Sequence, residues 1–322
     1  MGASVFSESK CTQIFQYVQV LGVTLGIEMQ ETGGFENRMP HFFARRLIET
    51  CGHRCSLWAN GKRKRSRTSS NGFTHPSKKQ QTMETKEEKK SAPKTKVYNV
   101  IILDRSGSMF TIRQAAIDGF NETLNGIKNA QQKFGDTQEH YVSLLTFCSC
   151  SMQQVMDKVP AAEARQLTLD DYAPCCCTPL YDAMGQTLTA MHRHVSGMDD
   201  VAVVVTIITD GIENDSHEYT AQSIKMLVSM LRTEGWTFTY MGANQDAESV
   251  AKSLNIRNAR NFEYNSDGAH EAMRKDTSTR MNYFQRLWGM RQAPGSAEMS
   301  ASERRKCYSK MADEAFDEEE SK

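Results

Sequence analysis

The chain has 322 residues, of which 39 % are hydrophobic and 24 % charged, as in an ordinary soluble globular protein with one good-sized α/β domain plus extensions, or with two small domains. The net charge of zero conceals an uneven distribution, because residues 1–96 hold 17 Lys and Arg against 8 Asp and Glu, whereas the remaining residues hold 22 against 31. The acidic remainder suits a cation and argues against nucleic acid as the ligand of the folded part.

The chain shows neither a membrane span nor an export signal. No stretch reaches the roughly 20 apolar residues that a membrane helix needs. The uncharged segment Cys11–Ile27 contains three Gln and two Thr, follows a single Lys10, and lacks a clear small-residue cleavage site. Nine cysteines, an odd number in a chain without an export signal, fit a reducing compartment. We therefore expect a cytoplasmic protein without membrane contact.

Residues 1–96 form a basic extension that we predict to be largely disordered. The run Lys62–Arg67 is followed by a stretch rich in Ser, Thr, Lys and Gln, and polar tracts of this kind rarely bury enough apolar surface to fold alone. A solvated linker is therefore favoured over a nuclear-import or nucleic-acid patch. Met83 is an alternative natural start, in which case residues 1–82 belong to an over-extended gene call.

From Val97 onward, strand and helix patterns alternate. Val97–Leu103 and Val201–Thr209 are short apolar runs rich in β-branched residues, typical of strands that are covered on both faces. Helices are predicted where apolar residues recur every three or four positions. In chain order, the predicted elements are strand Val97–Leu103, helix Ile112–Phe134, strand Tyr141–Phe147 with its hairpin partner Met152–Val159, helix Leu180–Val195, strand Val201–Thr209, helix Ala221–Thr233, strand Trp236–Met241, helix Ala247–Leu254, strand Asn261–Tyr264 and helix Gly268–Leu287.

This alternation predicts a domain of the α/β class over residues 97–288, with a doubly wound, mostly parallel sheet flanked by helices. Residues 289–322 are rich in charged and small residues and end close to the acidic run Asp317–Glu320. We expect this segment to be a charged, solvated tail.

Three polar clusters fall where such a sheet binds ligands, beyond the carboxyl ends of its parallel strands. Asp104–Met109 follows the first strand, Thr178–Asp182 opens the second long helix, and Asp210–Asn214 follows the central strand. Their hydroxyls and carboxylates are ligands for a hard cation such as Mg²⁺, which prefers about six oxygens. Helix capping and turn formation explain any one cluster by itself, but not all three together.

The pattern Asp104-x-Ser106-x-Ser108, a distant Thr178 and then Asp210-Gly211 resembles the metal-ion-dependent adhesion site (MIDAS) of von Willebrand factor type A (VWA) domains. The resemblance covers roughly Val97 to Leu287, includes all five motif positions, and is closest in form to the short intracellular bacterial members. It implies a Rossmann-like VWA fold.

The resemblance also implies how the site works. Ser106 and Ser108 would ligate Mg²⁺ or Mn²⁺ directly, Thr178 directly or through water, and Asp104 and Asp210 largely through water. An ion with few carboxylate ligands stays electron-poor and accepts a Glu or Asp from a protein partner. In the family, a change in the Thr contact couples to movement of the last helix, here Gly268–Leu287. The implied function is a metal-dependent protein-binding adaptor or scaffold, not an enzyme.

Two alternative functions remain open. The first is a thiol-redox or zinc-binding regulatory protein that uses a cysteine cluster; small residues that merely fill a tight loop are favoured over this interpretation. The cluster consists of Cys148, Cys150, Cys175, Cys176 and Cys177. The second is a magnesium-dependent phosphohydrolase, but there is no Gly-x-x-x-x-Gly-Lys-Ser/Thr loop, and Ser106 stands where aspartyl-phosphate hydrolases carry a second Asp.

Overall fold

The computed structural model describes residues 93–243, 247–263 and 266–320, and the account below concerns these residues. Nearly all of the predicted basic extension 1–96, with the alternative start Met83, lies outside them. No helix in the described ranges is long and apolar enough to cross a membrane.

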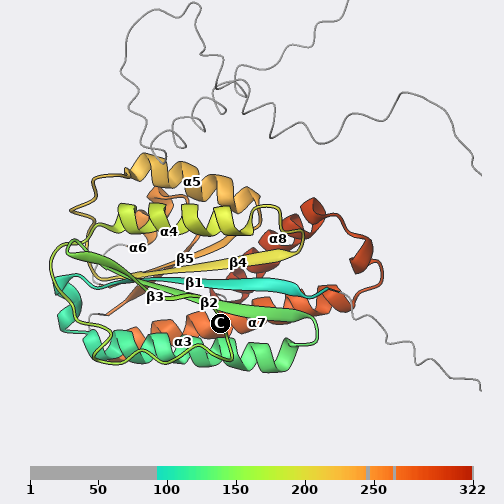
Figure 1. Cartoon of the computed structure of the whole chain (residues 1–322), viewed down its shortest axis with the longest axis horizontal. Helices are drawn as coiled ribbons and strands as arrows, with labels where there is room; N and C mark the ends of the chain where they lie inside the picture. The colour runs from blue at the N-terminus through green and yellow to red at the C-terminus, as the bar shows by residue number, and fades with distance from the viewer. Residues whose placement is uncertain (1–92, 244–246, 264–265, 321–322) are drawn as a thin grey trace, which may run out of the picture. The chain divides into compact units, whose positions relative to one another are not determined.

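A six-stranded sheet in the order β3-β2-β1-β4-β5-β6 forms the centre of the domain (Figure 1). All neighbouring pairs are parallel except β2 and β3, which form an antiparallel hairpin. The predicted doubly wound α/β fold is therefore confirmed. The strands are β1 Thr95–Asp104, β2 Gln138–Cys148, β3 Ser151–Pro160, β4 Val201–Thr209, β5 Thr237–Ala243 and β6 Asn258–Phe262.

Helices cover both faces of the sheet, and each face has its own apolar core (Figure 1). Val100 and Ile102 of β1 point to the face covered by α4, α5 and α6, whereas Ile101 and Leu103 point to the face covered by α3 and α7. Every residue of β4 is buried, as its unbroken apolar sequence predicts. The helices are η1 Gly107–Phe110, α3 Arg113–Phe134, α4 Leu180–Val195, α5 Ala221–Thr233, α6 Ala247–Ser253, α7 Ser266–Gln292, η2 Ser296–Glu298 and α8 Ala301–Glu320.

The predicted elements recur with small shifts at their ends. Helix α4 and strand β4 have the predicted bounds, while β1 begins two residues before Val97 and β2 three residues before Tyr141. The weak strand expected at Asn261–Tyr264 is β6, which begins three residues earlier and ends two residues earlier. Its first residue, Asn258, is buried and donates its side-chain amide to the carbonyl of Phe238 in β5. Polar residues at strand starts conceal such extensions from a hydrophobic pattern.

The expectation of a solvated segment after Gly289 is wrong for α8. Tyr308, Ala312, Ala315 and Phe316 are buried in a third core with residues of α3, β4 and α7. The Tyr308 hydroxyl also donates a hydrogen bond of 2.5 Å to Asp200. Spacings of four, three and one residues place the four side chains on one helix face. They are outnumbered by charged residues on the other faces, which is why composition alone indicated a tail.

Candidate metal centre

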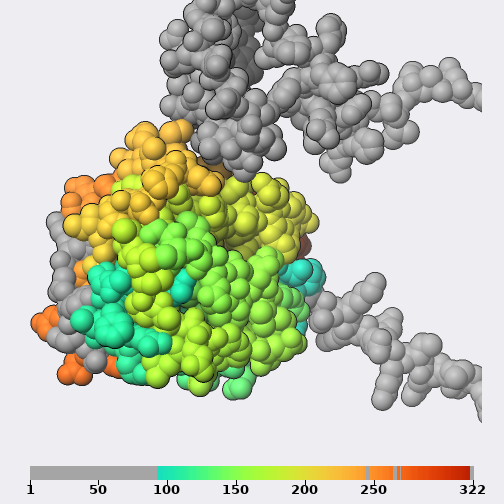
Figure 2. Space-filling model, turned by 60° about the vertical axis from the view of Figure 1, so that its left-hand side comes forward, coloured from blue at the N-terminus to red at the C-terminus, as the bar shows by residue number. Residues whose placement is uncertain are grey.

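The three predicted clusters meet at one edge of the sheet, where β1 and β4 end and α4 begins. Asp104 is the last residue of β1, Ser106 and Ser108 follow it, Thr178 lies two residues before α4, and Asp210 follows β4. Parallel pairing of β1 with β4 brings their carboxyl ends side by side, with Leu103 opposite Ile208. The space-filling view brings this edge forward, and the blue-green residues after β1 adjoin green and yellow-green residues of later segments (Figure 2).

Asp104 is fully buried and held by two hydrogen bonds. Its Oδ1 accepts the Ser106 backbone N–H at 2.7 Å, and its Oδ2 accepts the Thr209 hydroxyl at 2.6 Å. The pKa of Asp104 is raised from 3.8 to about 6, mainly by burial and to a smaller extent by the charge of Asp210, while the hydrogen bonds from Thr209 and Ser106 act to lower it. None of the ion pairs within the described ranges involves Asp104, so its negative charge has no basic side chain to offset it.

Asp210 is connected to the serines by a short chain of hydroxyls. The Ser108 hydroxyl donates to Asp210 Oδ1 at 2.7 Å, and it lies 3.1 Å from the Ser106 hydroxyl. The other carboxylate oxygen, Asp210 Oδ2, is buried and has no hydrogen-bond partner in the described part of the chain. A buried carboxylate oxygen without a partner is costly, and a cation or a cation-bound water would satisfy it.

Thr178 and Gly211 complete a group of residues around one opening, which we call the cradle. Its members are Asp104, Ser106, Ser108, Thr178, Asp210 and Gly211. A Cβ atom placed on Gly211 would lie 2.9 Å from Thr178 Oγ1, 3.5 Å from Asp104 Oδ2 and 3.6 Å from Ser106 Oγ, so these three oxygens converge on the space beside Gly211. Asn214 fixes the Thr178 backbone: its Oδ1 accepts the Thr178 N–H at 2.8 Å, and its own N–H donates to the Thr178 carbonyl at 3.2 Å. The structure thus brings all five predicted residues together.

Two carboxylates in the predicted clusters serve the backbone instead. Asp182 accepts the backbone N–H groups of the three residues 217–219 at 2.7–2.9 Å. Glu213 accepts the backbone N–H of Tyr181 at 2.9 Å and that of Ser216 at 2.8 Å. These bonds hold the start of α4 against the loop after β4. Both side chains therefore fix the backbone around the site and are not free to act as metal ligands.

Three supporting residues escaped the sequence analysis or had no role assigned in it. Thr209 counted only as the end of an apolar strand, yet it binds Asp104. Tyr172, in a loop without any pattern, is buried and donates its hydroxyl to the Asp104 carbonyl. Asn214 lay within a predicted cluster, but its bonds with the Thr178 backbone depend on the fold and have no signal in the sequence.

The donor set fits a hard divalent cation. It contains three hydroxyls and two carboxylates and no imidazole or thiol, the ligand chemistry that Mg²⁺ and Mn²⁺ prefer. The buried, unpaired Asp210 Oδ2 and the opening beside Gly211 both agree with an ion at this position.

Apolar side chains stand beside this cradle at the surface. Phe110, two residues after Ser108, is 67 % exposed, and Ile212, two residues after Asp210, is 76 % exposed. Large apolar side chains this exposed next to a polar cluster are typical of a surface that another protein covers.

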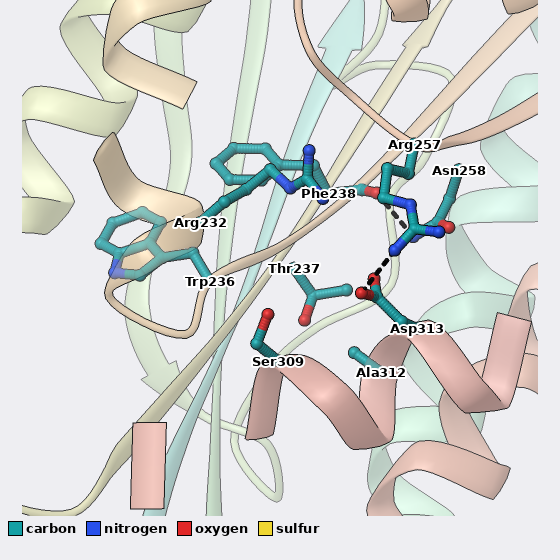
Figure 3. A pocket seen from close by; sticks show the side chains of 9 residues that line it. All are labelled: Arg232, Trp236, Thr237, Phe238, Arg257, Asn258, Ser309, Ala312 and Asp313. Carbon is teal, nitrogen blue, oxygen red and sulfur yellow. Dashed lines mark hydrogen bonds and ion pairs between the residues drawn. The ribbon is translucent and has the colours of Figure 1, made fainter. Parts of the chain in front are cut away.

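A shallow pocket lies elsewhere, where β5 and β6 begin and α8 passes (Figure 3). Arg257 of this pocket forms an ion pair with Asp313 at 2.7 Å. Because β5 and β6 are parallel, their starts lie at the edge opposite the carboxyl ends of the strands. None of the five predicted site residues lines this pocket.

No protein-family model matches the chain, and no curated protein matches it. Among solved structures, it is similar to proximal thread matrix protein 1 from the mussel byssus with a zinc-occupied MIDAS motif, at 15 % identity and a TM-score of 0.41 over 59 % of this chain and 46 % of that one. It is also similar to the SpRpn10 VWA domain, with 10 % identity and a TM-score of 0.38 over 56 % of this chain and 94 % of that one. Manganese-loaded TRAP protein of Plasmodium vivax matches with 16 % identity and a TM-score of 0.37 over 56 % of this chain and 72 % of that one.

Proposed function

We propose that the chain is a VWA domain protein that binds Mg²⁺ or Mn²⁺ at Asp104, Ser106, Ser108, Thr178 and Asp210, and that docks a protein partner through the ion. The observation that carries the proposal is the buried, unpartnered Asp210 Oδ2 in a site where the Ser106 and Thr178 hydroxyls and Asp104 Oδ2 converge on the space beside Gly211. This arrangement is costly for a surface that binds nothing.

The roles of the residues follow from their positions. Ser106, Ser108 and Thr178 offer neutral hydroxyl oxygens. Asp104 accepts hydrogen bonds from Ser106 and Thr209, while Asp210 accepts one from Ser108 and keeps its second oxygen unpartnered. When bound, a divalent ion supplies a positive centre that prefers oxygen ligands. Because the hydroxyls are neutral, they would leave much of that positive charge for a Glu or Asp of the partner.

The exposed apolar side chains indicate the partner's chemistry. Phe110 and Ile212 come from two of the segments that form the cradle, and both are mostly exposed. A partner that places its carboxylate on the ion would cover them with its own apolar side chains. We therefore propose an acidic residue flanked by apolar residues as the docking element.

The supporting carboxylates favour docking over catalysis. Asp182 and Glu213, the remaining acidic side chains of the three clusters, each accept backbone N–H groups and are unsuited to act as general bases. We propose a non-enzymatic adaptor or scaffold in the cytoplasm, similar to the intracellular bacterial members of the family.

Selection from a random-peptide phage library tests the proposal. The full chain is immobilised in Mg²⁺, and bound phage are eluted with EDTA. We expect every enriched peptide to contain Asp or Glu and to lose binding when that residue becomes Asn or Gln. Asp104→Ala should enrich nothing, whereas Asp199→Ala, which removes an exposed carboxylate just before β4, should enrich the same peptides. Enriched peptides without acidic residues, or peptides that remain bound in EDTA, would refute metal-mediated docking.

A further inference from the structure

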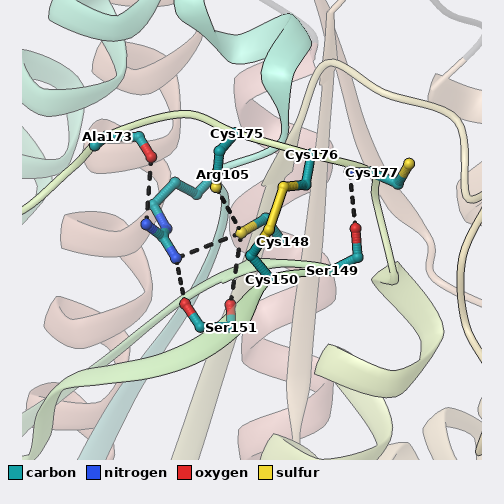
Figure 4. The surroundings of a disulfide bond; sticks show 9 residues. All are labelled: Arg105, Cys148, Ser149, Cys150, Ser151, Ala173, Cys175, Cys176 and Cys177. Carbon is teal, nitrogen blue, oxygen red and sulfur yellow. Dashed lines mark hydrogen bonds between the residues drawn. A yellow bond between two sulfur atoms is a disulfide. The ribbon is translucent and has the colours of Figure 1, made fainter.

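Five cysteines gather beside the candidate metal centre, on two segments far apart in the sequence (Figure 4). Cys148 ends β2 and Cys150 lies in the turn before β3, while Cys175, Cys176 and Cys177 lie in the loop before Thr178. A disulfide joins Cys150 to Cys176, and Cys148 Sγ lies 3.1 Å from Cys175 Sγ.

Four of these sulfurs surround one small region. The Sγ atoms of Cys148, Cys150 and Cys175 all lie within 4.8 Å of one another, and Cys176 is bonded to Cys150. In a tetrahedral zinc–thiolate site, a Zn–S distance of about 2.3 Å separates the sulfurs by about 3.8 Å. The sulfurs of Cys148, Cys150 and Cys175 therefore lie close enough together for a common ion, and Cys176 can join them only after its bond to Cys150 is broken.

A fixed positive charge lies against the cluster. Arg105 Nη2 lies 3.4 Å from Cys148 Sγ, and the same guanidinium donates to the Ser151 hydroxyl at 2.5 Å and to the Ala173 carbonyl at 3.3 Å (Figure 4). Four thiolates on one divalent ion leave a net charge of about −2, which a guanidinium beside the sulfurs offsets.

The backbone at Cys176 is unusual for a residue with a side chain. Its φ is 59°, in the left-handed region that favours glycine, at a cost on the order of 1 kcal/mol for other residues. A glycine would adopt this turn without that cost, so we infer that the side chain at position 176 makes an interaction that offsets it. Its sulfur lies in the cluster, bonded to Cys150.

We propose that the thiolates of Cys148, Cys150, Cys175 and Cys176 bind one Zn²⁺ when the Cys150–Cys176 disulfide is reduced. A dithiol supplies two electrons and two protons and becomes a disulfide, or a phosphine supplies two electrons, takes oxygen from one water and becomes a phosphine oxide while that water supplies the two protons. In either case the S–S bond breaks and two thiols form. Zinc then binds four thiolates, with release of up to four protons. The disulfide and the zinc site exclude each other, because both use Cys150 and Cys176.

Backbone hydrogen bonds connect this zinc site to the hard-cation centre. The Cys176 carbonyl accepts the N–H of Gly107, between Ser106 and Ser108, at 3.0 Å, and the Cys175 N–H donates to the Arg105 carbonyl at 2.9 Å. The loop that carries the three cysteines and Thr178 is therefore hydrogen-bonded to the segment that carries Ser106 and Ser108. The zinc site is distinct from the proposed docking function, and its existence does not depend on that function.

Cobalt substitution tests the site in the full chain reduced by a phosphine. Tetrahedral Co²⁺ with thiolate ligands gives intense visible and near-ultraviolet absorption, whereas an oxygen site gives only weak bands. We expect this absorption to saturate at one Co²⁺ per chain and to disappear when one equivalent of Zn²⁺ is added. Cys177→Ser and Cys307→Ser should each retain the absorption, and the double variant Cys148→Ser, Cys175→Ser should lose it. Absence of the absorption from the reduced wild type, or its persistence in the double variant, would overturn the assignment.

Alkylation mapping gives a second test that needs no variant. Reduced protein is alkylated with and without Zn²⁺, and each modified cysteine is identified by mass spectrometry. We expect zinc to slow the modification of Cys148, Cys150, Cys175 and Cys176 at least tenfold, while Cys177 and Cys307 react equally in both samples. Protection confined to other cysteines, such as Cys51 and Cys55, or equal reaction throughout, would show that the four do not form the site.

Discussion

Replacing Asp104 by Asn should stabilise the metal-free domain while abolishing its response to metal. Asp104 is fully buried, and its carboxylate lies near Asp210 without an ion pair. Asn keeps the shape and removes the charge. Its Oδ1 can still accept the Ser106 N–H, and its Nδ2 can donate to the Thr209 hydroxyl, which then turns its proton toward the Gly211 carbonyl, 3.2 Å away.

The pKa of Asp104 determines how much the Asp104→Asn substitution changes the free energy of unfolding. A carboxyl whose pKa is 3.8 when unfolded and about 6 when folded destabilises the ionised fold by roughly 3 kcal/mol. This penalty is absent below about pH 4, grows between pH 4 and 6, and is complete above pH 6, because the folded state holds its proton more tightly. Loss of the charged hydrogen bonds offsets part of the gain, so we expect Asp104→Asn to gain about 1–3 kcal/mol at pH 8.

Urea unfolding in EDTA, followed by tryptophan fluorescence, measures this difference at pH 8 and pH 4.5. The advantage of the variant should shrink on acidification. Mg²⁺ at 100 times its Kd should then stabilise the wild type by about 2.7 kcal/mol and the variant not at all. Asp199→Asn, at an exposed site, should behave like the wild type: it should gain no stability at pH 8 and should be stabilised by Mg²⁺ to the same extent. A variant less stable than the wild type at pH 8, or an advantage that does not depend on pH, would refute the reasoning.

Three further predictions concern the cradle and the core. Gly211→Ala should weaken Mn²⁺ binding in calorimetry at least tenfold, because its Cβ would lie 2.9 Å from Thr178 Oγ1, whereas Gly289→Ala, with open space around it, should bind normally; equal affinities would contradict the position of the ion. Asp276→Ala should cost about 3–5 kcal/mol in urea unfolding, since it leaves the buried Arg280 unpaired, and Arg280→Met in the same chain should restore part of the loss; a cost below about 1 kcal/mol would contradict this. A stop after Gln292 should remove about 3–6 kcal/mol through loss of buried Tyr308 and Phe316, and an unchanged unfolding midpoint would show that α8 does not stabilise the core.

Much of the fold follows from local patterns in the sequence. Val201–Thr209 could be assigned as a central strand because burial on both faces demands an unbroken apolar run. The five site residues could be brought together because the carboxyl ends of parallel strands share an edge, and β1 pairs with β4.

Other features depend on contacts that no local pattern contains. The burial of α8 follows from its packing on β4 and α7, and its charged outer faces hide this in the composition. Asp182 lies in one of the predicted ligand clusters, but in the structure it accepts three backbone N–H groups from the loop after β4. The path of that loop is not contained in any local pattern. The meeting of Cys148 with Cys175 required both the register of β2 beside β1 and the path of the loop before Thr178.

Anomalous diffraction from crystals grown with Mn²⁺ tests the central claim most directly. A single strong peak within about 2.3 Å of the Ser106 and Ser108 hydroxyl oxygens, beside Gly211, is the predicted result. A map without a peak at this edge of the sheet, at manganese concentrations that saturate known sites of this kind, would contradict a metal centre here and the docking function that depends on it.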